Sequence, residues 1–184
     1  HDMQDIEALA SRIILIGKGK LLMDGTFDDL RAMDDTGNLS LDELTAWCEE
    51  NKLHLCHWFT VDDLMYLKRG GRVSAATALV GTMLQIKPVL HVDNEGHLSN
   101  VSKTRGRKAS IEALAAKMGE TAIPGANDTV FICHGDCQQD VDYLSKLVKE
   151  KYGVKNVFSY YVGAVIGSHS GPGTLALFYM GTKR

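Results

Sequence analysis

The feature that most constrains the fold is a glycine-rich segment between two apolar runs near the carboxyl end of the chain. The runs cover residues 160–166 and 175–179, and both are typical of strands. The segment between them contains three glycines and a proline: Gly167, Gly171, Pro172 and Gly173. Glycine permits positive φ and the close approach of another group, and proline stiffens a turn. We therefore expect a tight, rigid loop that joins two core strands.

The same segment carries candidate groups for binding an anion. His169 lies in the predicted loop between the hydroxyls of Ser168 and Ser170. Because glycine leaves neighbouring backbone N–H groups unshielded, amides, hydroxyls and an imidazole would together form a donor-rich nest. The alternative is an ordinary structural turn whose histidine is merely exposed, and the density of glycine and proline does not decide between the two.

Length and charge limit the possible classes of protein. A chain of 184 residues suits one ordinary domain with a real core, and its net charge of −3 argues against a general nucleic-acid binder. Its longest apolar stretch, residues 75–86, is too short to cross a bilayer and is interrupted by Gly81. The acidic start does not resemble a signal peptide, and a first residue other than Met indicates a fragment or an internal start.

Four cysteines are present, and no pair of them has the spacing of a zinc site. Cys133 and Cys137 flank His134 and Asp136, which raises the alternative of a metal site. We prefer Cys133 as a core residue and Cys137 as the start of a helix, and we assign no metal. Because nothing calls for disulfides, we expect a reducing, cytoplasmic location.

The order of periodic segments predicts an α/β fold with a mixed sheet and packed helices, preceded by a short helix and hairpin. A polar link at residues 34–38 places the domain boundary between residues 1–35 and 36–184. We expect helices at 2–12, after the Ser40 capping box, after a cap at Thr60, Asp62 and Asp63, and at 75–83, 108–118 and 141–147. We expect strands at 13–16, 20–23, 53–59, 86–93, 97–103, 129–133, 157–161 and 175–179.

Two sets of basic residues are candidates for binding. Arg72 follows the Gly70-Gly71 pair that ends a predicted helix, so its guanidinium could point into a cleft and grip a carboxylate or phosphate. The alternative for a single arginine is a solvated side chain. A basic run contains Lys103, Arg105, Arg107 and Lys108. It has no interleaved aromatic residues to stack bases, so it is either a solvated edge or a docking patch for an acidic partner.

Residues 1–30 resemble the tail of an ABC-transporter ATP-binding subunit. The likeness rests on the His1-Asp2-Met3 start, the Arg12-Ile13 hairpin with Gly17 to Lys20, and Asp24-Gly25-Thr26. The chain has no phosphate-binding GxxxxGK[ST] loop, so we do not expect an ATPase. We interpret this segment as an added structural piece or a fusion remnant.

The remaining chain, from about residue 38, resembles the DegV family of bacterial fatty-acid-binding proteins. The motifs that carry the likeness are the segment from Phe59 to Ser74 with Gly70-Gly71-Arg72, then 86–88, 103–108, 132–136 and 167–173. The resemblance implies an acyl chain in an apolar tunnel between two α/β domains and a carboxylate held by hydroxyls and a histidine. It further implies presentation of the fatty acid, such as palmitate or oleate, to a partner kinase. No cofactor is implied.

The resemblance also implies residue roles. His169 is similar to the carboxylate-binding histidine, and Arg72 to the arginine near the head group. With them we group Ser168, Ser170 and Gly171 as candidate ligand-binding residues. Arg105 resembles a surface arginine that contacts the kinase, and Arg107 in the same basic run is a second candidate for that contact.

The sequence departs from the family pattern because the family's amino-terminal half, with its hydroxyl ligands, is absent. The apolar face left open would favour self-association. Three functions therefore stay open: a non-catalytic lipid-binding module, a ligand-free remnant that acts as a structural or interaction module, and a phosphoester-processing enzyme. The enzyme would use His169, His134 and Asp136 as acid and base, but we find no nucleophile–base pair in the sequence.

Overall fold

The computed structural model describes residues 13–17, 20–25, 41–73 and 86–183, and the chain divides into two compact units, His1–Lys52 and Leu53–Arg184. In the first unit, β1 (Ile13–Gly17) and β2 (Lys20–Gly25) form the predicted antiparallel hairpin. Helix α3 (Leu41–Asn51) begins with two acidic residues, which suit the positive end of a helix dipole. The helix predicted at 2–12 and the Ser40 cap lie outside the described residues.

The second unit contains a six-stranded sheet in the order β5-β4-β3-β8-β6-β7. Its strands are β3 (Leu55–Thr60), β4 (Ile86–Val92), β5 (Leu98–Arg105), β6 (Thr129–His134), β7 (Asn156–Tyr161) and β8 (Leu175–Met180). Neighbouring strands are antiparallel except β6 and β7, which are parallel. The predicted mixed α/β sheet is confirmed. The helix predicted at 75–83 lies outside the described residues.

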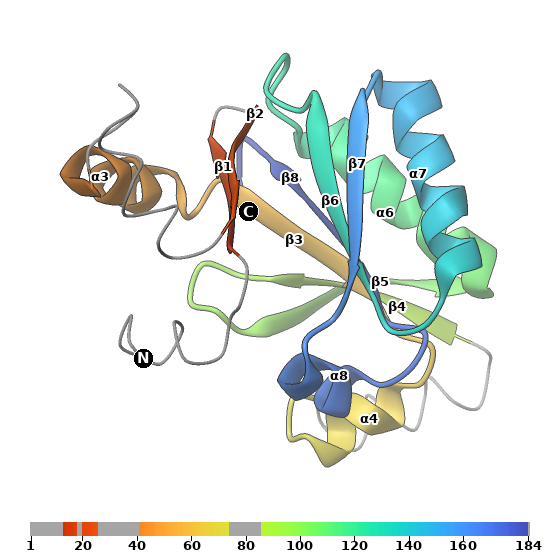
Figure 1. Cartoon of the computed structure of the whole chain (residues 1–184). Coiled ribbons are helices and arrows are strands. Elements are labelled where there is room, and N and C mark those ends of the chain that lie inside the picture. The colour runs from red at the N-terminus through yellow and green to blue at the C-terminus, as the bar shows by residue number, and fades with distance from the viewer. Residues whose placement is uncertain (1–12, 18–19, 26–40, 74–85, 184) are drawn as a thin grey trace. The chain divides into compact units, whose positions relative to one another are not determined.

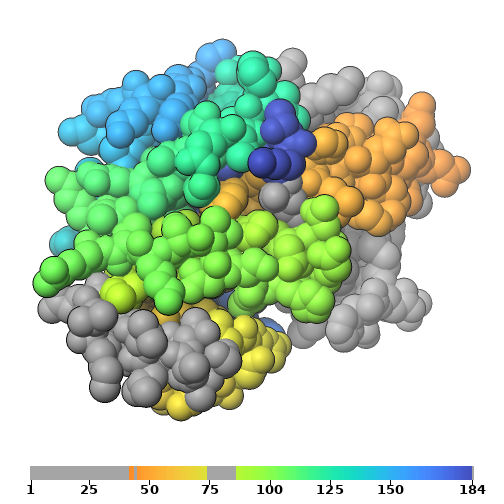
Figure 2. All heavy atoms as spheres, turned by 180° about the vertical axis from the view of Figure 1, so that it is seen from behind, coloured from red at the N-terminus to blue at the C-terminus, as the bar shows by residue number. Residues whose placement is uncertain are grey.

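One face of this sheet is covered by two long helices, α6 (Arg107–Thr121) and α7 (Gln138–Tyr152), which lie on the same side of the sheet in Figure 1. Atoms of both helices lie on the surface seen from behind in Figure 2, in green and blue. Strand residues alternate between the two faces of a sheet, so Cys56 and Trp58 of β3 point toward these helices. There they join a core with Leu114 of α6 and Leu144 of α7, both fully buried. This core makes the sheet a rigid platform for the opposite face.

The opposite face meets two short helices, α4 (Leu64–Arg69) and α8 (Ala164–Ser170), which lie side by side at one end of the sheet (Figure 1). A smaller core forms here from Phe59, Val61, Leu64, Leu67, Leu90 and Ala176. The apolar residues that α4 turns inward seal one end of this face.

The loop predicted between the last two strands is wrong in its first half, because residues 164–170 form α8. The β-branched run up to Ile166 predicted a longer strand, but β7 ends at Tyr161. Val and Ile favour strands, but this segment is helical: α8 contacts α4, while the Val165 and Ile166 side chains stay exposed. The tight turn itself is confirmed at Gly171 and Gly173, whose φ values are +78° and +76°.

The predicted cap of α4 also needs correction. Asp63 is the N-cap, and its side chain accepts a hydrogen bond of 2.8 Å from the amide of Met65. Thr60 instead ends β3 and pairs with Leu175, so it stands too far upstream to cap the helix. The predicted stop is confirmed, because the amide of Arg72 closes the helix end by donating to the carbonyl of Leu67.

Candidate functional site

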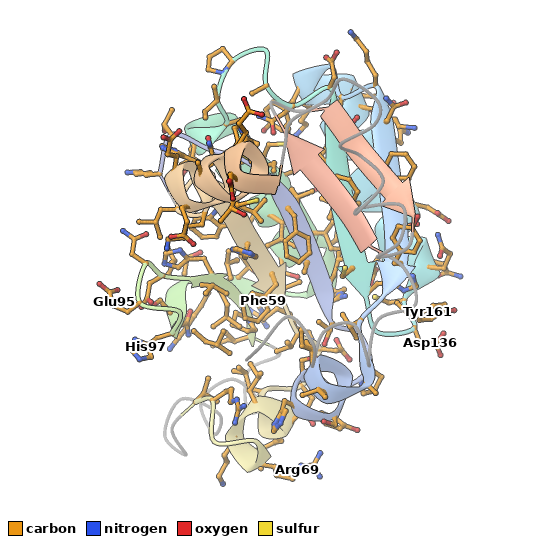
Figure 3. The ribbon with its side chains drawn as sticks, turned by 60° about the vertical axis from the view of Figure 1, so that its left-hand side comes forward. Phe59, Arg69, Glu95, His97, Asp136 and Tyr161 are labelled. Atoms are coloured by element: carbon orange, nitrogen blue, oxygen red, sulfur yellow. The ribbon has the colours of Figure 1, made fainter. Side chains whose placement is uncertain are left out.

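A cavity of about 560 Å³ lies in the second unit, on the sheet face that carries α4 and α8. Its floor comes from β3, β6 and β8, and its sides come from α4, α8 and the β4–β5 hairpin. Figure 3 shows Phe59 of the floor with His97 at the hairpin tip and Arg69 in the last turn of α4. The described lining residues are His57, Phe59, Leu67, Gly71, Arg72, Val92, Gly96, His97, Leu98, Cys133, Val162, Gly163, Val165, Ile166, His169, Ser170, Thr174, Ala176 and Phe178.

Two of the predicted head-group residues meet in this cavity, around the backbone of Gly70. His169 comes from the last turn of α8, and its ring packs against Gly70, which caps α4. A Cβ at Gly70 would collide with Nδ1 of His169, so only glycine leaves room for the ring in this position. Arg72 is exposed, and its guanidinium donates a 2.6 Å hydrogen bond to the carbonyl of Gly70. An imidazole and a guanidinium therefore share one rim of the cavity, as a carboxylate ligand requires.

Of the predicted serine and glycine ligands, Ser170 is among the described lining residues, and Ser168 and Gly171 are not. Ser170 is buried and lines the cavity, and its hydroxyl donates to the carbonyl of Ile166 at 2.8 Å. Ser168 is exposed, its hydroxyl donates to Val165, and it is not among the described lining residues. Gly171 is buried, and a Cβ there would collide with the ring of Tyr66. Ligand contact by Ser168 and Gly171 stays a prediction.

The remaining wall is mostly apolar and partly open. Val165 and Ile166 of α8 line the cavity, yet they are 74% and 62% exposed. Cys133 of β6 is half-buried in the floor, and burial raises the pKa of its thiol, so it stays neutral at physiological pH. An apolar slot with a few polar groups at one rim is the usual form of a lipid or small-molecule site.

Most of the described lining residues were not predicted from the sequence as ligand-binding residues, among them His57, His97, Cys133 and Phe178. The alternation of β3 and β8 could have identified His57 and Phe178, because they occupy the same sheet face as Phe59 and Ala176. Cys133 was predicted as core, and it does pack against the smaller core, but its position in a cavity floor was not foreseen. No local signal indicates His97, which the hairpin places at the rim.

The basic run lies where β5 passes into α6. Arg105 ends β5 and is exposed. Arg107 begins α6, where its Nε donates to the carboxylate of Asp140 in α7 at 2.9 Å, and its side chain is only 20% exposed. Arg107 therefore ties two helices together. Contact of either arginine with a partner stays a prediction.

The residues of the enzyme alternative do not gather at the cavity. His134 is 2% exposed, and its Nδ1 accepts a hydrogen bond of 3.3 Å from the amide of Cys137. Asp136 is exposed and has a positive φ of 55°. Figure 3 shows Asp136 and Tyr161 at the adjacent ends of the parallel strands β6 and β7. Neither His134 nor Asp136 is among the described residues that line the cavity.

Within residues 13–17, 20–25, 41–73 and 86–183, no three His, Cys, Asp or Glu side chains gather closely enough to hold a metal ion. No helix in that part of the chain combines the length and the apolar character needed to span a bilayer.

Comparisons with known proteins identify the family and the fold. A family model described as "Uncharacterised protein, DegV family" matches residues 28–182. A DegV domain-containing protein of Clostridium perfringens is 42% identical over 180 residues, which cover 98% of this chain and 60% of that protein. The alignment thus runs through most of residues 1–30, and the comparisons do not show the resemblance of that segment to transporter subunits.

Solved structures show the same fold. A fatty-acid-binding DegV family protein from Streptococcus agalactiae is 27% identical with a TM-score of 0.66, over 86% of this chain and 55% of that one. The fatty acid kinase B3 protein from Streptococcus pneumoniae, solved with linoleic acid, has a TM-score of 0.70 at 18% identity, over 83% and 53% of the two chains. The chain thus spans 60% or less of the length of these proteins. From the family match and the Clostridium relative, we conclude that this chain belongs to the DegV family.

Proposed function

We propose that this chain binds a long-chain fatty acid without catalysis, with the acyl chain in the apolar cavity and the carboxylate at its rim. The main support for this proposal is that Arg72 and His169 lie together at one edge of a mostly apolar cavity of about 560 Å³. The carboxylate accepts hydrogen bonds from the guanidinium and the imidazole. The hydroxyls of Ser168 and Ser170 and the amide of Gly171 donate to carbonyls of α8, so they would reach the ligand only by giving up those bonds. The similar protein from Streptococcus agalactiae is a fatty-acid-binding protein, which supports a fatty acid as the ligand.

Substitution of the head-group residues tests this proposal. We expect Arg72→Ala to weaken palmitate binding about threefold to tenfold, because an exposed charge-assisted contact contributes roughly 1 kcal/mol. His169→Ala should weaken it similarly and leave the melting temperature nearly unchanged. Isothermal titration with palmitate measures both effects.

A matched control lies nearby on the same helix end. Arg69 is exposed, stacks over the ring of Tyr66 at 4.4 Å and does not line the cavity, so Arg69→Ala should keep the wild-type affinity. Equal losses in Arg69→Ala and Arg72→Ala would show a general charge effect and contradict the assigned head-group site.

We further propose that the chain presents its bound fatty acid to a partner kinase. The support for this step is the exposed side chain of Arg105 beside the α6–α7 tie formed by Arg107. In this proposal an acidic surface of the kinase contacts Arg105. Arg107 supports the contact by keeping α6 and α7 together through Asp140. We propose that this transfer to the kinase takes place in the cytoplasm. The substitution Arg105→Glu should abolish kinase-dependent formation of acyl phosphate, while palmitate binding persists.

Two other hypotheses concern the function of the whole chain and the origin of its first segment. A ligand-free domain that acts as a structural or interaction module is the main alternative to fatty-acid binding. A transporter-derived segment at residues 1–35, with a DegV-like domain at 36–184, remains a hypothesis about origin. The proposed site needs only residues of the second unit and does not depend on it.

A further inference from the structure

The floor of the cavity has an uneven profile that follows from strand register. On the face toward α4 and α8, Phe59, Ala176 and Cys133 stand side by side on β3, β8 and β6. The two small residues, Ala176 and Cys133, are direct cross-strand partners, so they make a recess in the floor beside the larger ring of Phe59.

The next row on that face is closed by rings. His57, Phe178, Phe131 and Phe158 are successive cross-strand partners on β3, β8, β6 and β7. The rings of His57 and Phe178 meet edge to face at 5.4 Å, and those of Phe131 and Phe158 stack at 5.5 Å. The cavity reaches His57 and Phe178, whereas Phe131 and Phe158 do not contribute to its described lining. The rings of His57 and Phe178 therefore form the end of the recess in the cavity floor.

The head-group rim lies at the start of β8, whereas Phe178 stands further along that strand. Thr174 lines the cavity immediately before β8, followed on the same face by Ala176 and Phe178. At about 3.3 Å per residue, the distance from Thr174 to Phe178 is roughly 13 Å. Ser170 and His169, which precede the turn into β8, stand at the Thr174 end.

We infer that Phe178, braced by His57, sets the length of acyl chain that the cavity accepts, and that Ala176 provides the recess through which the chain passes. This inference rests on the proposed fatty-acid function and adds the residues that select among fatty acids. A chain whose end meets the Phe178 ring fills the slot. Further methylenes must turn away from it or stay in water, where they gain no burial free energy.

A chain-length series tests the assignment. Affinities of the 184-residue protein for straight saturated fatty acids from decanoate to eicosanoate are measured by isothermal titration, for wild type, Phe178→Ala and Ala176→Leu. Phe178→Ala should move the best-bound length upward, with about a fourfold gain for each methylene that finds a buried place. Ala176→Leu should shift it toward shorter acids. If Phe178→Ala does not fold, Phe178→Leu should give a smaller shift in the same direction.

Phe158→Ala is the matched control, because it removes an identical ring from the same row but outside the described lining. It should leave the best-bound length unchanged. A wild-type optimum retained in Phe178→Ala, or an equal shift in Phe158→Ala, overturns the length assignment while fatty-acid binding stands. A wild-type protein that binds no acid of any length overturns the proposed function itself.

Discussion

At the scale of single residues, the absence of a side chain at Gly70 shapes the head-group rim. Gly70 has φ −76° and ψ −2°, a helical conformation that alanine adopts freely. Its role is therefore spatial: the ring of His169 occupies the place of a Cβ, and Arg72 bonds to the Gly70 carbonyl. The Gly-Gly-Arg motif and the distant histidine thus form one structural unit.

We predict that Gly70→Ala weakens palmitate binding at least threefold by displacing the His169 ring, since the new Cβ would overlap Nδ1 of that ring. The free energy of unfolding should change by no more than about 1 kcal/mol, because the backbone tolerates alanine. Isothermal titration and urea unfolding measure the two effects.

A double substitution separates this clash from other effects. If Gly70→Ala acts through His169, it should add nothing to His169→Ala, because residues in contact give non-additive changes. Full additivity of the two losses would contradict the account.

At the scale of elements, the turn of the β4–β5 hairpin at one side of the cavity is closed by backbone hydrogen bonds and by one carboxylate. Asp93 accepts hydrogen bonds from the amides of His97 and Glu95 and from the hydroxyl of Ser99, at 2.8, 3.1 and 3.0 Å. The amide of His97 is the main cause that lowers the pKa of Asp93 below its usual value. Ionised Asp93 thereby fixes the turn that carries the rim residue His97.

The sign of the pH dependence follows from that lowered pKa. Folding favours the ionised form, so the contribution of Asp93 is complete above its unfolded pKa of about 3.9 and is lost as pH falls through the lower folded value. We predict that the His97 amide resonance moves with a midpoint below about 3.9 in an NMR titration, and that Asp93→Asn removes this movement. A midpoint at or above the ordinary value would contradict the bonding pattern.

The same scale shows what sequence patterns can and cannot predict. Hairpins, long helices and the Gly171–Gly173 turn follow local rules of periodicity and backbone freedom, and the structure confirms them. Helix α8 was missed because Val165 and Ile166 favour strands locally, whereas the contacts of α8 with α4, such as His169 against Gly70, join segments far apart in the sequence. His97 was missed because its place at the cavity depends on a long-range arrangement that no neighbouring residue encodes.

At the scale of the whole molecule, the second unit leaves apolar side chains uncovered at its cavity. Val165 and Ile166 are the most exposed aliphatic residues among those described as large and apolar. The relative from Clostridium perfringens is longer, since this chain spans 60% of it. Apolar patches of this kind favour association, so the chain should self-associate when no other protein covers the face.

We predict that the double substitution Val165→Ser with Ile166→Ser lowers the association constant measured by sedimentation equilibrium by about tenfold, because it removes roughly 1–2 kcal/mol of apolar contact. Val101→Ser is the control, since Val101 is 46% exposed on β5 and does not line the cavity. An equal decrease in both variants would indicate association that does not involve the open face.

The central claim is that the cavity holds a fatty acid by its carboxylate, and the most direct test is native mass spectrometry of protein purified from a bacterial host, followed by organic extraction. The account predicts a bound mass equal to a fatty acid in wild type and in Arg69→Ala, and its loss in the double variant Arg72→Ala with His169→Ala. An empty wild-type protein that also fails to take up added palmitate or oleate would contradict the account and leave a folded domain without a ligand.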